Sequence, residues 1–114
     1  MLTYTDGGRR TDSVRTAISK QPGGTHADEM ETSMLLYMYP QFVDMTKAAN
    51  DYHPGAGGLA RDSAMSVRDG KTWSRTGIYG DATLATREKG RQYVEAHLLD
   101  ILESIEALRR MPVQ

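Results

Sequence analysis

The architecture of this chain depends most on residues 83–112, TLATREKGRQYVEAHLLDILESIEALRRMP. Apolar side chains recur there at alternating intervals of four and three residues, at Val94, Leu98, Ile101, Ile105 and Leu108. Thr83 and Thr86 each offer a hydroxyl for the N-cap, and Pro112 prevents continuation. We therefore expect a helix of about 25 residues. Its apolar stripe holds only about two heptads, which favours packing on a sheet over pairing with a second copy.

His97 lies on the flank of this expected helix. Asp100 is its one acidic neighbour at helical spacing. A solvated surface pair is a commoner outcome of this spacing than a pair of metal ligands. We assign His97 no catalytic role.

Shorter elements are expected upstream. Asp12 or Ser13 is suited to cap a helix through Ile18, which the Pro22 segment with its two glycines ends. Residues 34–38, MLLYM, are apolar around most of a helical circumference, which predicts a helix buried on most sides that ends or kinks at Pro40. Residues 42–49 predict a further short helical turn, and residues 1–5 alternate weakly, as in a short strand.

Residues 50–76 show neither helical nor strand periodicity. Long loops of this kind often form binding surfaces, so we expect a lid or a subunit contact. Trp73, with Arg75 nearby, is a candidate for lining that surface. Trp73 covering the edge of the core is an equally good interpretation.

Composition excludes several classes of function. The chain has 114 residues, and its 14 Lys and Arg residues nearly balance 15 Asp and Glu residues, so no broad cationic field attracts nucleic acid or acidic lipid. The lack of cysteine excludes disulfides and thiolate chemistry, and is compatible with a reducing compartment. No apolar run approaches the ~18 residues of a membrane span, and we read no export signal. We expect a cytoplasmic protein without nucleic-acid or membrane partners.

The densest chemistry lies in residues 26–33, HADEMETS, which follow a Gly-containing loop and precede the apolar segment. His26 would lie on that loop, and Glu31 would fall in the first turn of the helix. Unpaired N–H groups and the helix dipole favour an ionised carboxylate there, the state that a metal ion or a proton-transfer partner needs. First-turn acids are also common without any function, and a loop histidine is often only solvated. The residues alone leave both interpretations open.

Two segments resemble the creatininase family of amidohydrolases. Residues 26–36, HADEMETSMLL, resemble the family's HAGxxETSxML segment, with Asp28 in the usual Gly place. Residues 77–90, GIYGDATLATREKG, are similar to the family's GxxGDPxxAxxEKG segment, with Ala82 in the usual Pro place. The resemblance covers residues 14–111 in the family's order. Asp81 is expected to tie the start of the following helix rather than to touch substrate.

The resemblance implies an α/β arrangement of three layers around a largely parallel sheet. It implies that residues 1–114 form a single incomplete domain, a helix-rich C-terminal part of such an enzyme with a long C-terminal helix. In the family, most metal ligands come from N-terminal Glu-x-His and Asn-Gly-His segments and an Asp, and this sequence has neither segment. We therefore expect the chain to be inactive alone and to need a complementary N-terminal chain or upstream sequence. It is also expected to form homo-oligomers.

The implied reaction is hydrolysis of a C–N amide bond in a small cyclic or linear substrate, by a hydroxide held between divalent ions such as Zn or Mn. His26 would carry a proton to the leaving nitrogen, and Glu31 would bind or orient the metal or the water. Asp28 and Trp73 are the candidates for contact with the substrate. The alternative is a non-catalytic assembly or interaction module that keeps the family scaffold.

Overall fold

The structure, a computed structural model, describes residues 7–23, 26–52 and 76–112. The described residues form the α-helices α1 (Arg9–Ile18), α2 (Glu29–Met38) and α3 (Arg87–Arg109). Short 3-10 turns follow α2, at η1 (Pro40–Phe42) and η2 (Met45–Lys47), and precede α3, at η4 (Ala82–Leu84). The strand expected at residues 1–5 and most of the expected loop, with Trp73 and Arg75, lie outside the described residues.

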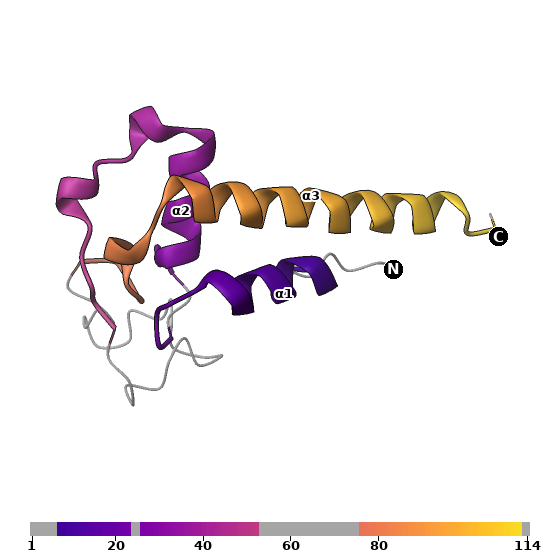
Figure 1. Cartoon of the computed structure of the whole chain (residues 1–114). Helices are drawn as coiled ribbons and strands as arrows, with labels where there is room; N and C mark the ends of the chain where they lie inside the picture. The colour runs from indigo at the N-terminus through magenta and orange to yellow at the C-terminus, as the bar shows by residue number, and fades with distance from the viewer. Residues whose placement is uncertain (1–6, 24–25, 53–75, 113–114) are drawn as a thin grey trace, which may run out of the picture.

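α1 and α2 pack against α3 from its start as far as Asp100 and Glu103. α1 runs antiparallel along α3, α2 crosses α3 near its start, and the C-terminal end of α3 extends beyond α2 and past the start of α1 (Figure 1). In the described ranges no strand forms, and extended pairing is limited to two isolated bridges, His26 with Tyr79 and Asn50 with Asp81. The expectations of a helix-rich chain and of a long C-terminal helix are therefore confirmed.

The bounds of α3 follow the sequence pattern. The Thr86 hydroxyl accepts a hydrogen bond from the Lys89 N–H at 3.2 Å, so Thr86 is the N-cap. Thr83, the other candidate, lies in η4, where Asp81 accepts from its N–H at 3.0 Å. The helix then runs for 23 residues and ends before Pro112. Asp81 thus ties the segment that leads into α3, as expected.

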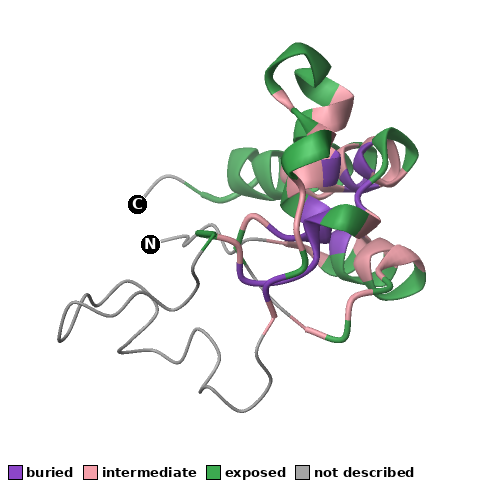
Figure 2. Cartoon of the chain, turned by 90° about the vertical axis from the view of Figure 1, so that its left-hand side faces the viewer, coloured by how far each residue is buried: buried purple, intermediate pink, exposed green. Residues whose placement is uncertain are grey.

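The expected buried face of α3 is wrong. The helix buries Gly90, Tyr93 and Ala96, whereas the large side chains at Leu98, Ile105 and Leu108 are 45–52% exposed. Tyr93 is the one large apolar side chain among these buried residues, beside Gly90 and Ala96, so the pattern of large apolar side chains indicates a neighbouring face of the helix instead. The end of α3 also projects beyond the other helices, and Figure 2 shows it as an exposed ribbon.

The expected burial of the apolar segment in α2 is also wrong. α2 buries Glu29, Met30 and Ser33 in its first half, while Leu35 and Met38 are 47% and 45% exposed. The reason is geometric, because α3 crosses α2 near Ser33 and the second half of α2 continues beyond that crossing, on the side away from α1 (Figure 1). The expected end before Pro40 is confirmed, since α2 stops at Met38 and Pro40 opens η1.

α1 begins earlier than expected and is capped from a distance. Neither Asp12 nor Ser13 is the N-cap, because the helix starts at Arg9, after Gly8. Asp100 of α3 accepts instead from the backbone N–H groups of Arg10 at 3.3 Å and Thr11 at 2.8 Å. Its expected role as a solvated partner of His97 is thus wrong. A capping group 89 residues along the chain from Thr11 leaves no local sequence signal.

This arrangement predicts a pH-dependent contact between α1 and α3. Hydrogen bonds from the Thr11 backbone, the Thr11 hydroxyl and Arg10 hold the pKa of Asp100 well below its ordinary value of 3.8. A carboxylate with a depressed folded-state pKa stabilises the fold above its unfolded pKa, and this stability is lost as the pH falls through the folded value. We expect the free energy of unfolding to fall below pH 3.8. In Asp100→Asn, the free energy of unfolding should depend less on pH in this range, as measured by urea titrations at several pH values. A pH dependence equal to that of wild type would contradict the role of Asp100.

None of the described helices combines the length and the apolar composition needed to cross a lipid bilayer.

Candidate functional site

Glu29 joins the starts of α2 and α3 to the end of α1. Its side chain is fully buried and accepts from the Ser19 hydroxyl at 2.9 Å and from the backbone N–H groups of Lys20 and Gln21 at 2.8 and 2.9 Å. The ammonium group of Lys89 forms an ion pair with the same carboxylate. Burial alone would raise the pKa of Glu29, but these hydrogen bonds, that from Lys89 first, hold it below its ordinary value. Glu29 is therefore an ionised structural anchor.

Ser33 and Gly90 bring the backbones of α2 and α3 into contact. The Ser33 hydroxyl donates to the Glu29 carbonyl at 2.6 Å and accepts from the Thr86 N–H at 3.1 Å. A Cβ atom at Gly90 would lie 1.8 Å from the Ser33 carbonyl oxygen, so only glycine fits this crossing. The two segments singled out in the sequence, residues 26–36 and 77–90, are thus packed against each other.

Asp28 caps α2. One carboxylate oxygen accepts from the N–H groups of Met30 at 2.9 Å and Glu31 at 3.0 Å, and the other accepts from the Gln21 side chain at 2.8 Å. Its φ of −86° is open to any residue, so a side chain here costs the turn nothing. Gly80, with φ of +150°, makes room for it, because a Cβ there would lie 2.6 Å from that of Asp28. Contact between Asp28 and substrate stays a prediction.

His26 lies on the loop before α2 with its side chain exposed. Its backbone pairs with Tyr79, since the His26 N–H donates to the Tyr79 carbonyl at 3.2 Å and the Tyr79 N–H donates back at 2.8 Å. The next residue, Ala27, has φ of +47°, a left-handed conformation that is unusual for a residue other than glycine. Its N–H donates to the Glu31 carboxylate at 2.5 Å. Glu31 lies in the first turn of α2, as expected.

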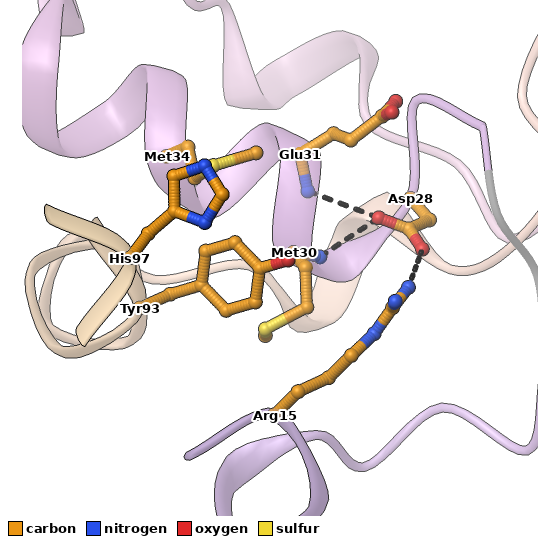
Figure 3. Close-up of a pocket in the computed structure, with 7 residues that line it drawn as sticks. All are labelled: Arg15, Asp28, Met30, Glu31, Met34, Tyr93 and His97. Carbon is orange, nitrogen blue, oxygen red and sulfur yellow. Dashed lines mark hydrogen bonds and ion pairs between the residues drawn. The ribbon is translucent and has the colours of Figure 1, made fainter. Parts of the chain in front are cut away.

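A cavity of about 350 Å³ lies between the three helices (Figure 3). Its lining comes from all of them, with Arg15 from α1, Asp28, Met30, Glu31 and Met34 from the cap and first turns of α2, and Tyr93 and His97 from α3. The cavity brings together two predicted residues, Asp28 and Glu31, but His26 is not part of its lining.

Five of these lining residues were not predicted from the sequence, namely Arg15, Met30, Met34, Tyr93 and His97. The rings of Tyr93 and His97 stack with centroids 6.2 Å apart and an interplanar angle of 11°. Their spacing of four residues, one turn after Gly90, is a signal that could have marked this face of α3. The Arg15 guanidinium lies 3.8 Å from the Asp28 carboxylate, an ion pair that no spacing in the sequence indicates.

In the part of the chain that the structure describes, no three His, Cys, Asp or Glu side chains come close enough to share a metal ion. Asp28 and Glu29 have their oxygens engaged by protein donors, and Glu31 holds Ala27. These residues therefore do not by themselves fit a metal centre. Trp73, the other candidate for contact with the substrate, lies outside the described residues.

Comparison with known proteins identifies one family. The model of the creatininase family, described as creatinine amidohydrolase, matches residues 2–105. The match begins before residue 14, where the recognisable resemblance starts, and it includes both docked segments. No curated protein and no solved structure matches the chain. Because the family model covers most of its length, the chain belongs to the creatininase family.

Proposed function

We propose that this chain is part of a metal-dependent amidohydrolase that hydrolyses a C–N amide bond in a small cyclic or linear substrate. Family membership supports the reaction class. We further propose that residues 1–114 form a single incomplete domain of the α/β three-layer family fold, corresponding to its C-terminal part. The helix-rich content of the described residues is compatible with that fold.

The observation that carries this proposal is the presentation of His26. The residue is exposed, and its backbone is held by two hydrogen bonds to Tyr79 of the second family segment. An imidazole can donate a proton to the leaving nitrogen of an amide. A fixed backbone reduces the freedom that the ring must lose when it meets the substrate. We assign His26 the role of proton carrier.

We propose that the enzyme uses divalent ions, Zn or Mn. We also propose that most of the ligands of these ions lie outside this chain. The chemistry of the family supports the ions, and the described side chains supply at most isolated donors such as Glu31. The remaining ligands would come from a complementary N-terminal chain, and assembly into homo-oligomers is part of the same proposal. The near balance of charges supports the proposal that the protein has no nucleic-acid or membrane partner. We also propose a cytoplasmic location, with which the lack of cysteine is compatible.

Removal of the His26 imidazole should abolish most turnover. We expect His26→Ala, assembled with an N-terminal family half in Zn or Mn, to lower kcat for amide hydrolysis by about 10²–10⁴-fold without changing metal content. Gln41→Ala, at an exposed polar position in η1, is the matched control and should keep full activity. Unchanged turnover in His26→Ala would remove His26 from the mechanism. Tight binding of two metal ions by the chain alone would contradict the proposed origin of the ligands.

A non-catalytic assembly module is the second candidate. The exposed leucines at positions 98, 99, 102 and 108 of α3 favour it, because such a face is suited to packing against another chain. A stable complex with the N-terminal half that binds metal yet hydrolyses no amide would favour this role over the enzyme.

A further inference from the structure

The turn between His26 and α2 is held by two side chains from the helix that follows it. Ala27 adopts φ of +47°, a conformation that residues with a Cβ atom rarely adopt unless neighbouring contacts hold them there. The Glu31 carboxylate accepts from its N–H at 2.5 Å, and the Thr32 hydroxyl donates to its carbonyl at 3.3 Å. Both the N–H and the carbonyl of Ala27 are thus hydrogen-bonded to side chains in the first turn of α2.

Glu31 is not needed to cap the helix. Asp28 already accepts from the N–H groups of Met30 and Glu31, which are the donors that a capping side chain serves. A glutamate at this position commonly reaches back to the N–H of the N-cap residue itself. Here Glu31 reaches one residue further, to Ala27. Figure 3 shows its carboxylate directed away from the rings of Tyr93 and His97.

We propose that Glu31 is a positioning residue, whose carboxylate holds the left-handed Ala27 turn and so fixes the direction in which His26 is presented. The backbone of His26 is then fixed on both sides, by Tyr79 before the turn and by Glu31 after it. The functional part of this inference rests on the proposed role of His26. The structural part concerns the turn alone and can be tested without any activity.

The test is hydrogen exchange of single backbone amides, followed by NMR on the full chain. Glu31→Ala should speed exchange of the Ala27 amide at least about tenfold relative to wild type. Glu31→Gln, which keeps an acceptor oxygen, should stay within about threefold. Glu88→Ala removes an exposed carboxylate from the first turn of α3 and is the matched control, with no effect at Ala27. The Gly90 amide, which donates to the Thr86 carbonyl at the start of α3, is the reference, and its exchange rate reports global unfolding.

Three results would overturn the proposal. They are unchanged exchange at Ala27 in Glu31→Ala, equal acceleration in Glu31→Gln and Glu31→Ala, and parallel acceleration at Gly90, which would mean a loss of global stability. In the assembled enzyme, Glu31→Ala should lower kcat with little change in KM, and Glu31→Gln should restore most of it. Absence of hydrolysis in the wild-type assembly would count against the proposed function, while the exchange rates would still decide the role of Glu31.

Discussion

Replacing Gly90 with alanine should be the most destabilising single-methyl change in the described part of this chain. The added Cβ would lie 1.8 Å from the carbonyl oxygen and 2.4 Å from the carbonyl carbon of Ser33, and 3.0 Å from the nitrogen of Met34. All three are backbone atoms of α2, so no side-chain rotation relieves the overlap. The helices must move apart, and this breaks the contacts that Ser33 and Glu29 make with the start of α3.

The expected loss for Gly90→Ala is at least about 3 kcal/mol, the upper range for overpacking, against a total stability of about 5–15 kcal/mol for ordinary domains. Helix propensity acts in the opposite direction, because alanine is favoured over glycine by about 1 kcal/mol within a helix. Urea denaturation followed by circular dichroism measures the sign directly. Ala107→Gly at an exposed position of the same helix is the control and should cost about 1 kcal/mol. A Gly90→Ala variant as stable as wild type would show that α2 and α3 do not cross here.

Breaking the Glu29–Lys89 pair should produce the second large effect. Lys89→Met leaves a buried carboxylate without its cation, a change that typically costs about 3–5 kcal/mol. Glu29→Gln keeps one acceptor oxygen and replaces the other with an NH2 group, which would face protein donors at either position, Lys89 and the Lys20 N–H among them. We expect each single variant to lose several kcal/mol of unfolding free energy, and the double variant to lose clearly less than the sum.

The same pair predicts an effect of pH with a defined sign. The folded-state pKa of Glu29 lies below its ordinary value of 4.5, so its stabilisation is present above pH 4.5 and is lost as the pH falls through the folded value. The difference in free energy of unfolding between wild type and Glu29→Gln should therefore become smaller as the pH falls below 4.5. Glu95→Gln, which breaks an exposed pair with Arg91, is the control and should change stability little. Additive single effects, or a deficit that does not depend on pH, would contradict a coupled ionised pair.

Local signals predicted the parts of the fold whose causes are local. The limits of α3 are set locally, at its start by the Thr86 hydroxyl and at its end by Pro112, which has no N–H group. The sequence pattern was therefore sufficient to predict them. The cap of α1 was missed because it comes from Asp100 on another helix. The buried face of α3 was missed for a different reason. Gly90 is buried because the backbones of α2 and α3 meet there, and a pattern of hydrophobic residues does not indicate such a contact.

The candidate site divides in the same way. The place of Glu31 in the first helical turn follows from the sequence, since the helix has to begin after the Gly-containing loop. The Asp28 cap is a local feature that the sequence prediction overlooked, since Asp28 accepts from Met30 and Glu31 only two and three residues further along. The support that His26 receives from Tyr79 depends on pairing with a segment about 50 residues further along the chain. The cavity depends on three helices at once, and this is why Arg15, Tyr93 and His97 could not be predicted from the spacing around His26.

The two family segments form one packed unit that holds the backbone of His26. Hydrogen exchange of the His26 and Tyr79 amides tests it most directly, because each donates to the other's carbonyl. Both amides should exchange slowly and with similar protection in the wild-type chain, and Lys89→Met should accelerate both together. Exchange of either amide at the rate of an unstructured peptide in the wild-type chain would show that the second segment does not hold His26.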